Sequence, residues 1–278
     1  MCAYPIKAEA ASHTKVTGAR TSSAPTMVTV TAGGSANTYG TYASIGTTPT
    51  DRPTVGIVLH QSVSSNSGQD RNMLVTLRTV SGTGTIIVQD FYIGCEGRVW
   101  ISHFIPVRVP PNTAVYAGIK CATASATVTL CADFCTDQFM GGQGGFGRMT
   151  SYGVVNSGGT QVISPVTANT YTTTPVELTA STTYPIKAFY LSSSPTPGTA
   201  VAFANFAWKV MVGGAGSEQI LATDRCFQHT TSETSTMQNW PQGVWTGADV
   251  PAGSRLSAAV SSGSGTAVAF GMIVHGVH

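Results

Sequence analysis

Hydrophobic and polar residues alternate in short runs along most of this chain. In Met27–Thr31 apolar and polar side chains alternate, and Thr54–Leu59 is a short apolar run after a proline. A period of two places successive side chains on opposite faces of a β-strand. No stretch sustains the 3.6-residue period of an amphipathic helix. The pattern therefore predicts an all-β protein with little helix, of the sandwich or jelly-roll kind.

The expected strands are short and are separated by turns rich in Gly, Pro, Ser and Thr. In the first half they are Met27–Thr31, Tyr39–Ile45, Thr54–Leu59, Met73–Val80, Thr85–Val88, Arg98–Val109, Ala114–Lys120 and Thr127–Phe134. In the second half they are Thr183–Leu191, Ala202–Val212, Gln219–Thr223, Arg255–Val260 and Thr266–His275.

Three segments of the first half recur in the second half, in the same order and about one domain length apart. The matched pairs are Asp51–His60 with Thr183–Ser192, Leu74–Gly82 with Asn205–Gly213, and Val109–Ile119 with Val250–Val260. A pattern that repeats at this period indicates two copies of one structural unit. We therefore expect two tandem copies of a β-sandwich or jelly-roll module.

The same pattern suggests the domain boundaries. Residues 1–25 are polar and aperiodic and are expected to form an N-terminal arm. Module 1 is expected over residues 26–140 and module 2 over residues 165–278. The glycines of Gly141–Gly147 predict a Gly-rich linker or surface loop over residues 141–164.

Composition limits the class of protein. Charged residues make up 9% of the chain, hydrophobic residues 42%, and the formal net charge is +2. This balance excludes a disordered chain, and no apolar run approaches the roughly 18 residues of a transmembrane helix. A charge of +2 also argues against nucleic acid as a partner. Few charges leave little repulsion between copies, so we expect a homo-oligomer that binds neither nucleic acid nor a membrane.

The first residues and the cysteines indicate the compartment. Met1–Ala10 lacks the basic start and apolar stretch of a secretory signal, so we expect assembly in the cytoplasm. The six cysteines form no recognisable disulfide framework. Most are expected to be small, buried, reduced core residues.

The search for reactive motifs assigns no catalytic, cofactor-binding or metal-binding residue. The glycines of Gly141–Gly147 are not followed by the Lys and Ser/Thr of a phosphate-binding loop. Cys131 and Cys135 with His103 lack the second ligand pair of a zinc finger. The histidines are scattered, although a triad assembled by the fold stays open because triads are recognised by geometry. We expect a protein that is not an enzyme, with a hydrolase of surface polymers as a remaining alternative.

Three tryptophans are candidates for a glycan site or a subunit interface. Trp240 and Trp245 flank a short segment whose Pro and Gly residues predict an exposed loop. Trp100 occupies a comparable position in the first copy. Indole rings bind sugars, but they more often fill cores or interfaces. We favour the core or interface interpretation and keep glycan binding open.

A neutral, Gly/Ser/Thr/Ala-rich chain of duplicated β-modules with a polar N-terminal arm resembles the structural proteins of tailed bacteriophage particles. The similar proteins are capsid decoration, head-fibre and tail-associated proteins. The resemblance implies a place in the virion, partners among major capsid or tail subunits, and a role in stabilising the particle. The alternative is a receptor- or glycan-binding module at a fibre tip. The candidate partner contacts are Tyr4, Ile6 and Lys7 in the arm and Phe146 and Arg148 in the loop.

Overall fold

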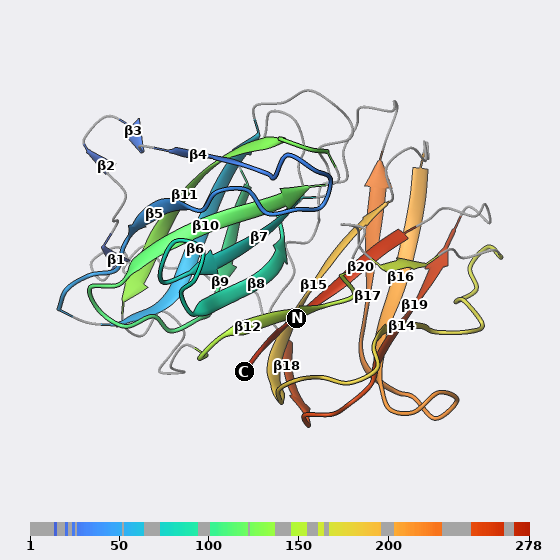
Figure 1. Cartoon of the computed structure of the whole chain (residues 1–278). Helices are drawn as coiled ribbons and strands as arrows, with labels where there is room; N and C mark the ends of the chain where they lie inside the picture. The colour runs from blue at the N-terminus through green and yellow to red at the C-terminus, as the bar shows by residue number, and fades with distance from the viewer. Residues whose placement is uncertain are drawn as a thin grey trace.

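The chain is all-β throughout the residues that the structure, a computed structural model, describes (Figure 1). These residues are 14–15, 20–21, 24–25, 27–51, 53–63, 73–93, 101–121, 123–136, 146–154, 161–163, 167–195, 203–229, 246–263 and 270–278. The predicted fold class, a β-sandwich or jelly roll, is confirmed. Within the described part of the chain, no helix is long and apolar enough to cross a lipid bilayer.

The first half forms two facing sheets. Its strands are β4 (Val28–Thr31), β5 (Ala43–Thr47), β6 (Thr54–Val63), β7 (Met73–Arg78), β8 (Ile86–Tyr92), β9 (Ile101–Ile105), β10 (Ala114–Cys121) and β11 (Thr127–Thr136). One sheet has the order β4-β11-β6-β9, and the strands of the other follow the order β5-β10-β7-β8. Eight strands that alternate between two sheets in this way have the connectivity of a jelly roll.

The second half repeats this pairing. Its strands are β13 (Gln161–Ile163), β14 (Val176–Thr179), β15 (Ile186–Pro195), β16 (Phe203–Val212), β17 (Gln219–His229), β18 (Thr246–Val250), β19 (Leu256–Ser262) and β20 (Phe270–Val277). They pair in the orders β13-β20-β15-β18 and β14-β19-β16-β17. The pairing pattern of the first half therefore recurs strand for strand. That the halves are copies of one ancestral module stays a prediction, because pairing does not record descent.

A short strand joins the two halves into one continuous sheet. β12 (Met149–Tyr152) pairs antiparallel with β20 and parallel with β8, where Met149 faces Val88. The result is a nine-stranded sheet with the order β18-β15-β20-β12-β8-β7-β10-β5 and with β13 beside β12 on β20. Figure 1 shows β12 between the halves. Residues 141–164, predicted to be a linker, thus contain two strands among their described residues.

One described segment of the predicted arm pairs with its own module. β1 (Thr14–Lys15) pairs with β11, and Thr14 lies opposite Cys135. β2 (Arg20–Thr21) and β3 (Ala24–Pro25) form a separate two-stranded hairpin. β1 and β4 share one edge of β11, just as β12 and β13 share one edge of β20. The rest of residues 1–25 lies outside the described residues.

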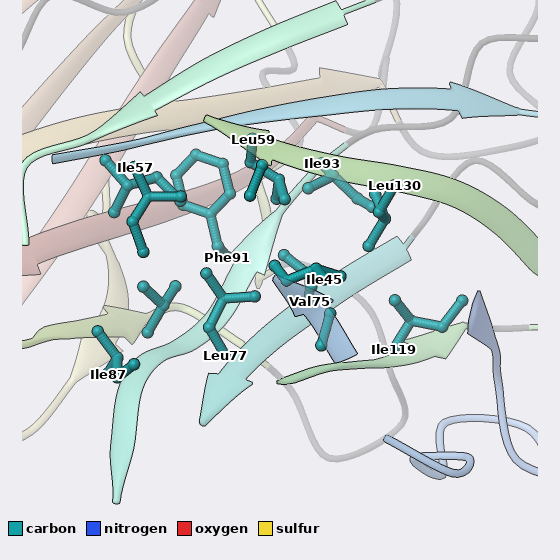
Figure 2. Close-up of a cluster of buried hydrophobic side chains, with 14 of the residues drawn as sticks. Ile45, Ile57, Leu59, Val75, Leu77, Ile87, Phe91, Ile93, Ile119 and Leu130 are labelled. Carbon is teal, nitrogen blue, oxygen red and sulfur yellow. The ribbon is translucent and has the colours of Figure 1, made fainter. Parts of the chain in front are cut away.

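The hydrophobic core crosses the boundary between the halves. Phe91, Ile57 and Leu59 are fully buried, and Figure 2 shows them in one cluster between the sheets of the first half. That cluster also contains Ala188 and Tyr190 of β15, whereas Phe189, between them, belongs to the core of the second half. Successive side chains of β15 thus pack into different cores, so the sheet that contains β15 is covered on both faces.

Three cysteines have described surroundings. Cys121, Cys131 and Cys135 are buried and form no disulfide bond. The predicted burial is confirmed at these three positions, and the reduced state stays a prediction.

Candidate functional site

The outer face of the β4-β11-β6-β9 sheet carries a histidine between a serine and a carboxylate. The Nδ1 atom of His60 lies 2.7 Å from Oγ of Ser102. Its Nε2 atom lies 3.1 Å from Oδ2 of Asp133. Serine hydrolases also line up serine, histidine and carboxylate, but there Nε2 faces the serine and Nδ1 the carboxylate, so the two ring nitrogens are exchanged here.

Strand register brings these three residues together. His60 on β6 lies directly opposite Ser102 on β9. On its other side His60 lies opposite Cys131 of β11, so Asp133 is its diagonal neighbour on the same face. Leu59 is fully buried in the core, and the period of two therefore turns His60 outward.

Hydrogen bonding selects one tautomer of His60. The Asp133 carboxylate can only accept, so the proton of a neutral imidazole is placed on Nε2 and donated to Asp133. Nδ1 then carries a lone pair and accepts a hydrogen bond from the Ser102 hydroxyl. The side chains of His60 and Asp133 are 16% and 14% exposed, whereas Ser102 is exposed. The Asp133 carboxylate is therefore largely shielded from water, whereas the Ser102 hydroxyl is exposed to solvent.

An apolar pair lies next to this array. Val58 and Phe104, both half-buried, face each other across β6 and β9, two residues along from His60 and Ser102. The Phe104 ring lies over Gly56, where a Cβ would come within 2.4 Å of Cε2 of the ring. Glycine at position 56 therefore leaves room for the ring, which extends along β6 away from His60.

Neither a metal ion nor a thiolate is suggested by the surroundings. Burial, reinforced by the Asp133 charge, raises the pKa of Cys135 to about 11, so this thiol stays protonated and is a poor nucleophile. Within the described residues, no group of three or more His, Cys, Asp and Glu side chains could hold a metal ion.

A second histidine contacts two serines but lies in the interior, between the halves. His275 on β20 is fully buried, and its Nδ1 and Nε2 atoms lie 2.6 Å from Oγ of Ser151 and 2.9 Å from Oγ of Ser192. Ser151 donates its hydroxyl proton to the carbonyl of Gln89 at 2.7 Å. It therefore accepts from Nδ1–H of His275, and Nε2 accepts from Ser192.

Phe91 links His275 to another buried histidine. The Phe91 ring centroid lies 4.6 Å from that of His275 and 5.2 Å from that of His103. Burial lowers the pKa of His275 to about 3, with a smaller effect of nearby His103. Burial also lowers the pKa of His103 to about 4, against the opposing effect of a hydrogen bond to the Ile93 backbone. Both rings are therefore neutral at pH 7.

A polar and aromatic cluster lies on the outer face of the β5-β10-β7-β8 sheet. Asp90 has a positive φ of 52°. Its carboxylate accepts a hydrogen bond from the Tyr39 hydroxyl and forms an ion pair with Lys120 at 2.8 Å. The Lys120 ammonium also lies 5.2 Å from the centroid of the Tyr39 ring. Burial raises the pKa of Tyr39 strongly, and Asp90 adds to the effect. These groups satisfy one another, which is typical of a structural cluster.

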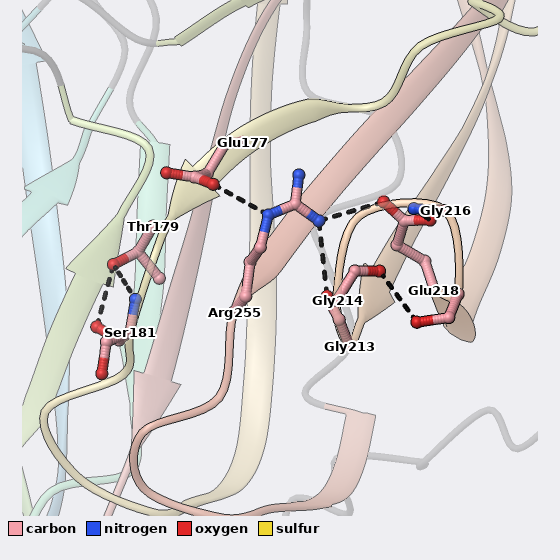
Figure 3. A network of polar contacts seen from close by, with 9 residues as sticks. Glu177, Thr179, Ser181, Gly213, Gly214, Gly216, Glu218 and Arg255 are labelled. Atoms are coloured by element: carbon pink, nitrogen blue, oxygen red, sulfur yellow. Dashed lines mark hydrogen bonds and ion pairs between the residues drawn. The ribbon is translucent and has the colours of Figure 1, made fainter.

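Arg255 holds a loop of the second half in place (Figure 3). Its Nε atom lies 2.8 Å from Glu177 and its Nη1 atom 3.0 Å from Glu218. Nη1 also donates to the carbonyl of Gly213 at 3.3 Å. The guanidinium thus ties β14 to the turn between β16 and β17.

Only two of the predicted contact residues have described positions. The Phe146 amide donates to the carbonyl of Pro106 at 2.9 Å, and its half-buried ring packs against the first core. Arg148 donates to the hydroxyl of Tyr184 at 2.9 Å and lies 4.7 Å from the centroid of that ring. Both residues have partners within the chain, and their role as subunit contacts stays a prediction. The other candidates, Tyr4, Ile6, Lys7, Trp100, Trp240 and Trp245, lie outside the described residues.

Motif analysis of the sequence did not find the Ser102–His60–Asp133 array. Its members are 42 and 73 residues from His60 along the chain. The expected strand Thr54–Leu59 ended before His60, and no local spacing indicates which strands become its neighbours.

Comparison with known proteins leaves the chain without a family. No protein-family description and no curated protein matches it. A solved structure of PNGF-II overlaps 91% of this chain at 9% sequence identity, with a TM-score of 0.40. This chain covers 65% of that one, just under two thirds of its length. A likeness of this size carries no argument about function.

Proposed function

We propose that this protein is a structural component of a virus particle, such as a bacteriophage virion, where it decorates or stabilises the capsid or tail. One observation carries the proposal: two successive sets of eight strands have jelly-roll connectivity. Jelly rolls are recurrent in capsid proteins and also in lectins. The partners in this proposal are other virion subunits and further copies of the chain.

The joined sheet supports a mechanical role. Because β12 fuses sheets from both halves and one core cluster crosses the boundary, a load on one half is transmitted to the other through packed side chains. β5 and β18 stand at the two ends of the nine-stranded sheet. An end strand presents backbone N–H and C=O groups that can pair with another subunit.

The low charge of the chain supports close packing of copies. With 9% charged residues and a net charge of +2, the repulsion that opposes assembly is small. Repeated weak contacts from two modules would also hold such a protein on a symmetric lattice more firmly than one contact could.

Absolute mass in solution tests this proposal. The full chain is measured by light scattering after size exclusion at two concentrations, and the same sample is viewed by electron microscopy. A discrete oligomer or ordered particles would support a structural role. A monomer at both concentrations, with no ordered assembly, would overturn it. The alternative of glycan binding at Trp100, Trp240 and Trp245 stays a prediction, which a glycan array of the monomer would test.

A further inference from the structure

We propose that Ser102, His60 and Asp133 form a nucleophilic site that hydrolyses short-chain carboxylic esters on the outer face of the first sheet. This inference goes beyond the proposed particle role and does not depend on it. It also opposes the expectation, drawn from the sequence, that the chain is not an enzyme.

The geometry provides the three functions that the reaction needs. Ser102 Oγ lies 2.7 Å from His60 Nδ1, within the range over which a base removes a hydroxyl proton. Asp133 accepts from Nε2–H at 3.1 Å, holds the imidazole in the basic tautomer and stabilises the imidazolium that forms. All three side chains lie on paired strands of one sheet, so the sheet positions them in advance.

The reaction balances with water as the second substrate. Ser102 Oγ forms a bond to the ester carbonyl carbon, its proton moves to His60 Nδ1, and the carbonyl π electrons move onto oxygen. The tetrahedral intermediate then breaks its bond to the alkoxy group, which leaves as an alcohol with the proton from Nδ1. Water attacks the acyl-serine in the same way, with His60 as base, and releases the carboxylic acid and Ser102.

Accessibility distinguishes Ser102 from Ser151, which is half-buried. Ser102 is exposed, so a carbonyl carbon can approach its hydroxyl. Ser151 also lies 2.6 Å from a histidine, but His275 is fully buried and the proton of Ser151 is committed to the Gln89 carbonyl. A serine therefore contacts a histidine at both sites. At Ser102, however, a carboxylate orients the histidine and the serine hydroxyl is exposed to solvent.

The surroundings of Ser102 indicate the substrate class. Val58 and Phe104 form an apolar pair on the same face of the sheet, two residues along from His60 and Ser102, and the Phe104 ring lies over Gly56. A short apolar acyl chain on Ser102 could extend along the sheet toward this pair. Ser102 is open to solvent, so water would solvate the oxyanion, and we expect only the general-base contribution of about 10²–10⁴-fold.

A fluorophosphonate probe, which reacts covalently with activated serines, tests the proposal on the full chain. Labelling is followed by intact mass and by peptide mapping, and hydrolysis of p-nitrophenyl acetate is measured in parallel. We expect one adduct per chain, on Ser102, and none in Ser102→Ala. His60→Gln should slow labelling by about 10²–10⁴-fold, and Asp133→Asn should slow it in the same direction. Ser151→Ala is the matched control and should leave the labelling rate unchanged.

The labelling results distinguish an activated serine from an unreactive one. Labelling of Ser102 that depends on His60 and Asp133 would support the site. Absence of an adduct on Ser102, or an adduct that forms at the same rate in His60→Gln, would overturn it. Because His60 lies in a strand, thermal unfolding of each variant confirms folding, and the labelling rate of Asp133→Asn decides the question if His60→Gln does not fold. None of these results depends on the oligomeric state.

Discussion

Two histidines in this protein each contact serine hydroxyls, but they lie in opposite environments. His60 lies on the outer face of one sheet, between an exposed serine and an aspartate. His275 lies between the halves of the molecule, fully buried, with a serine at each ring nitrogen. In the described residues no carboxylate forms an ion pair with His275 or His103.

The difference shows how burial and a neighbouring carboxylate change the role of a histidine that contacts serine. At His275 the hydrogen bonds satisfy polar atoms that would otherwise be costly in the interior, and the histidine stays neutral. At His60 the carboxylate orients the ring and the serine remains open to solvent. We therefore expect the buried cluster to affect stability and the outer cluster to affect chemistry, and four measurements test this division.

Acidification should have the largest effect on stability, and this effect should come from the buried histidines His275 and His103. The pKa of His275 is lowered to about 3 and that of His103 to about 4, whereas both are about 6.5 in the unfolded chain. The unfolded state thus takes up protons first, so stability is lost as pH falls from about 6.5. Each histidine contributes roughly 1 kcal/mol per pH unit, or on the order of 5 kcal/mol together by pH 4.

Urea unfolding at pH 7, 5 and 4 measures this loss. His275→Gln keeps a donor and an acceptor but does not titrate, so about half of the pH dependence should disappear. An identical pH dependence in the wild-type chain and this variant would contradict the assignment.

Truncation of the ring between the buried histidines should have the next largest effect. Phe91 is fully buried and its ring lies against His275, His103 and Tyr190. Phe91→Ala should lower the free energy of unfolding by about 3–5 kcal/mol, because it leaves a cavity in the core that both halves share. Val80→Ala is the control, because Val80 is 52% exposed and should change stability by less than about 0.5 kcal/mol. Equal losses for the two variants would refute a shared core at Phe91.

Removal of the half-buried serine beside His275 should have an intermediate effect on stability. Ser151→Ala takes the hydrogen-bond partner from Nδ1 of His275 and from the Gln89 carbonyl. Stability should fall by about 1–3 kcal/mol, because buried polar atoms are left without partners. Chemical denaturation of the variant measures the loss, and a change within error of zero would show that the serine is dispensable there.

The smallest effect on stability is expected on the outer face. Ser102→Ala should change the free energy of unfolding by less than about 0.5 kcal/mol, because Ser102 is exposed and water can replace its hydroxyl. Compared with Ser151→Ala in the same denaturation series, it gives the sharpest contrast between the two clusters. A loss as large as that of Ser151→Ala would mean that the outer serine is structural as well.

Several strand positions followed from the sequence, although β6 and β17 extend beyond their expected ends. The expected strands Met73–Val80, Ala114–Lys120 and Thr127–Phe134 correspond to β7, β10 and β11, which differ from them by at most two residues at either end. Tyr39–Ile45 was expected as one strand, but β5 begins only at Ala43, because the Tyr39 ring is held against Asp90 and Lys120. The short strands β12, β13, β14 and β18 were not expected. Each is three to five residues long.

The sequence by itself determined that the chain forms strands, and which face of many strands points inward, because a period of two is a local property. It also determined the low charge that favours close contact between copies. Only the tertiary structure decided which strands are neighbours, since register depends on pairing between distant segments. Ser102 and His103 illustrate this: they are adjacent in β9, yet one lies in solvent beside His60 and the other lies in the core beside Phe91.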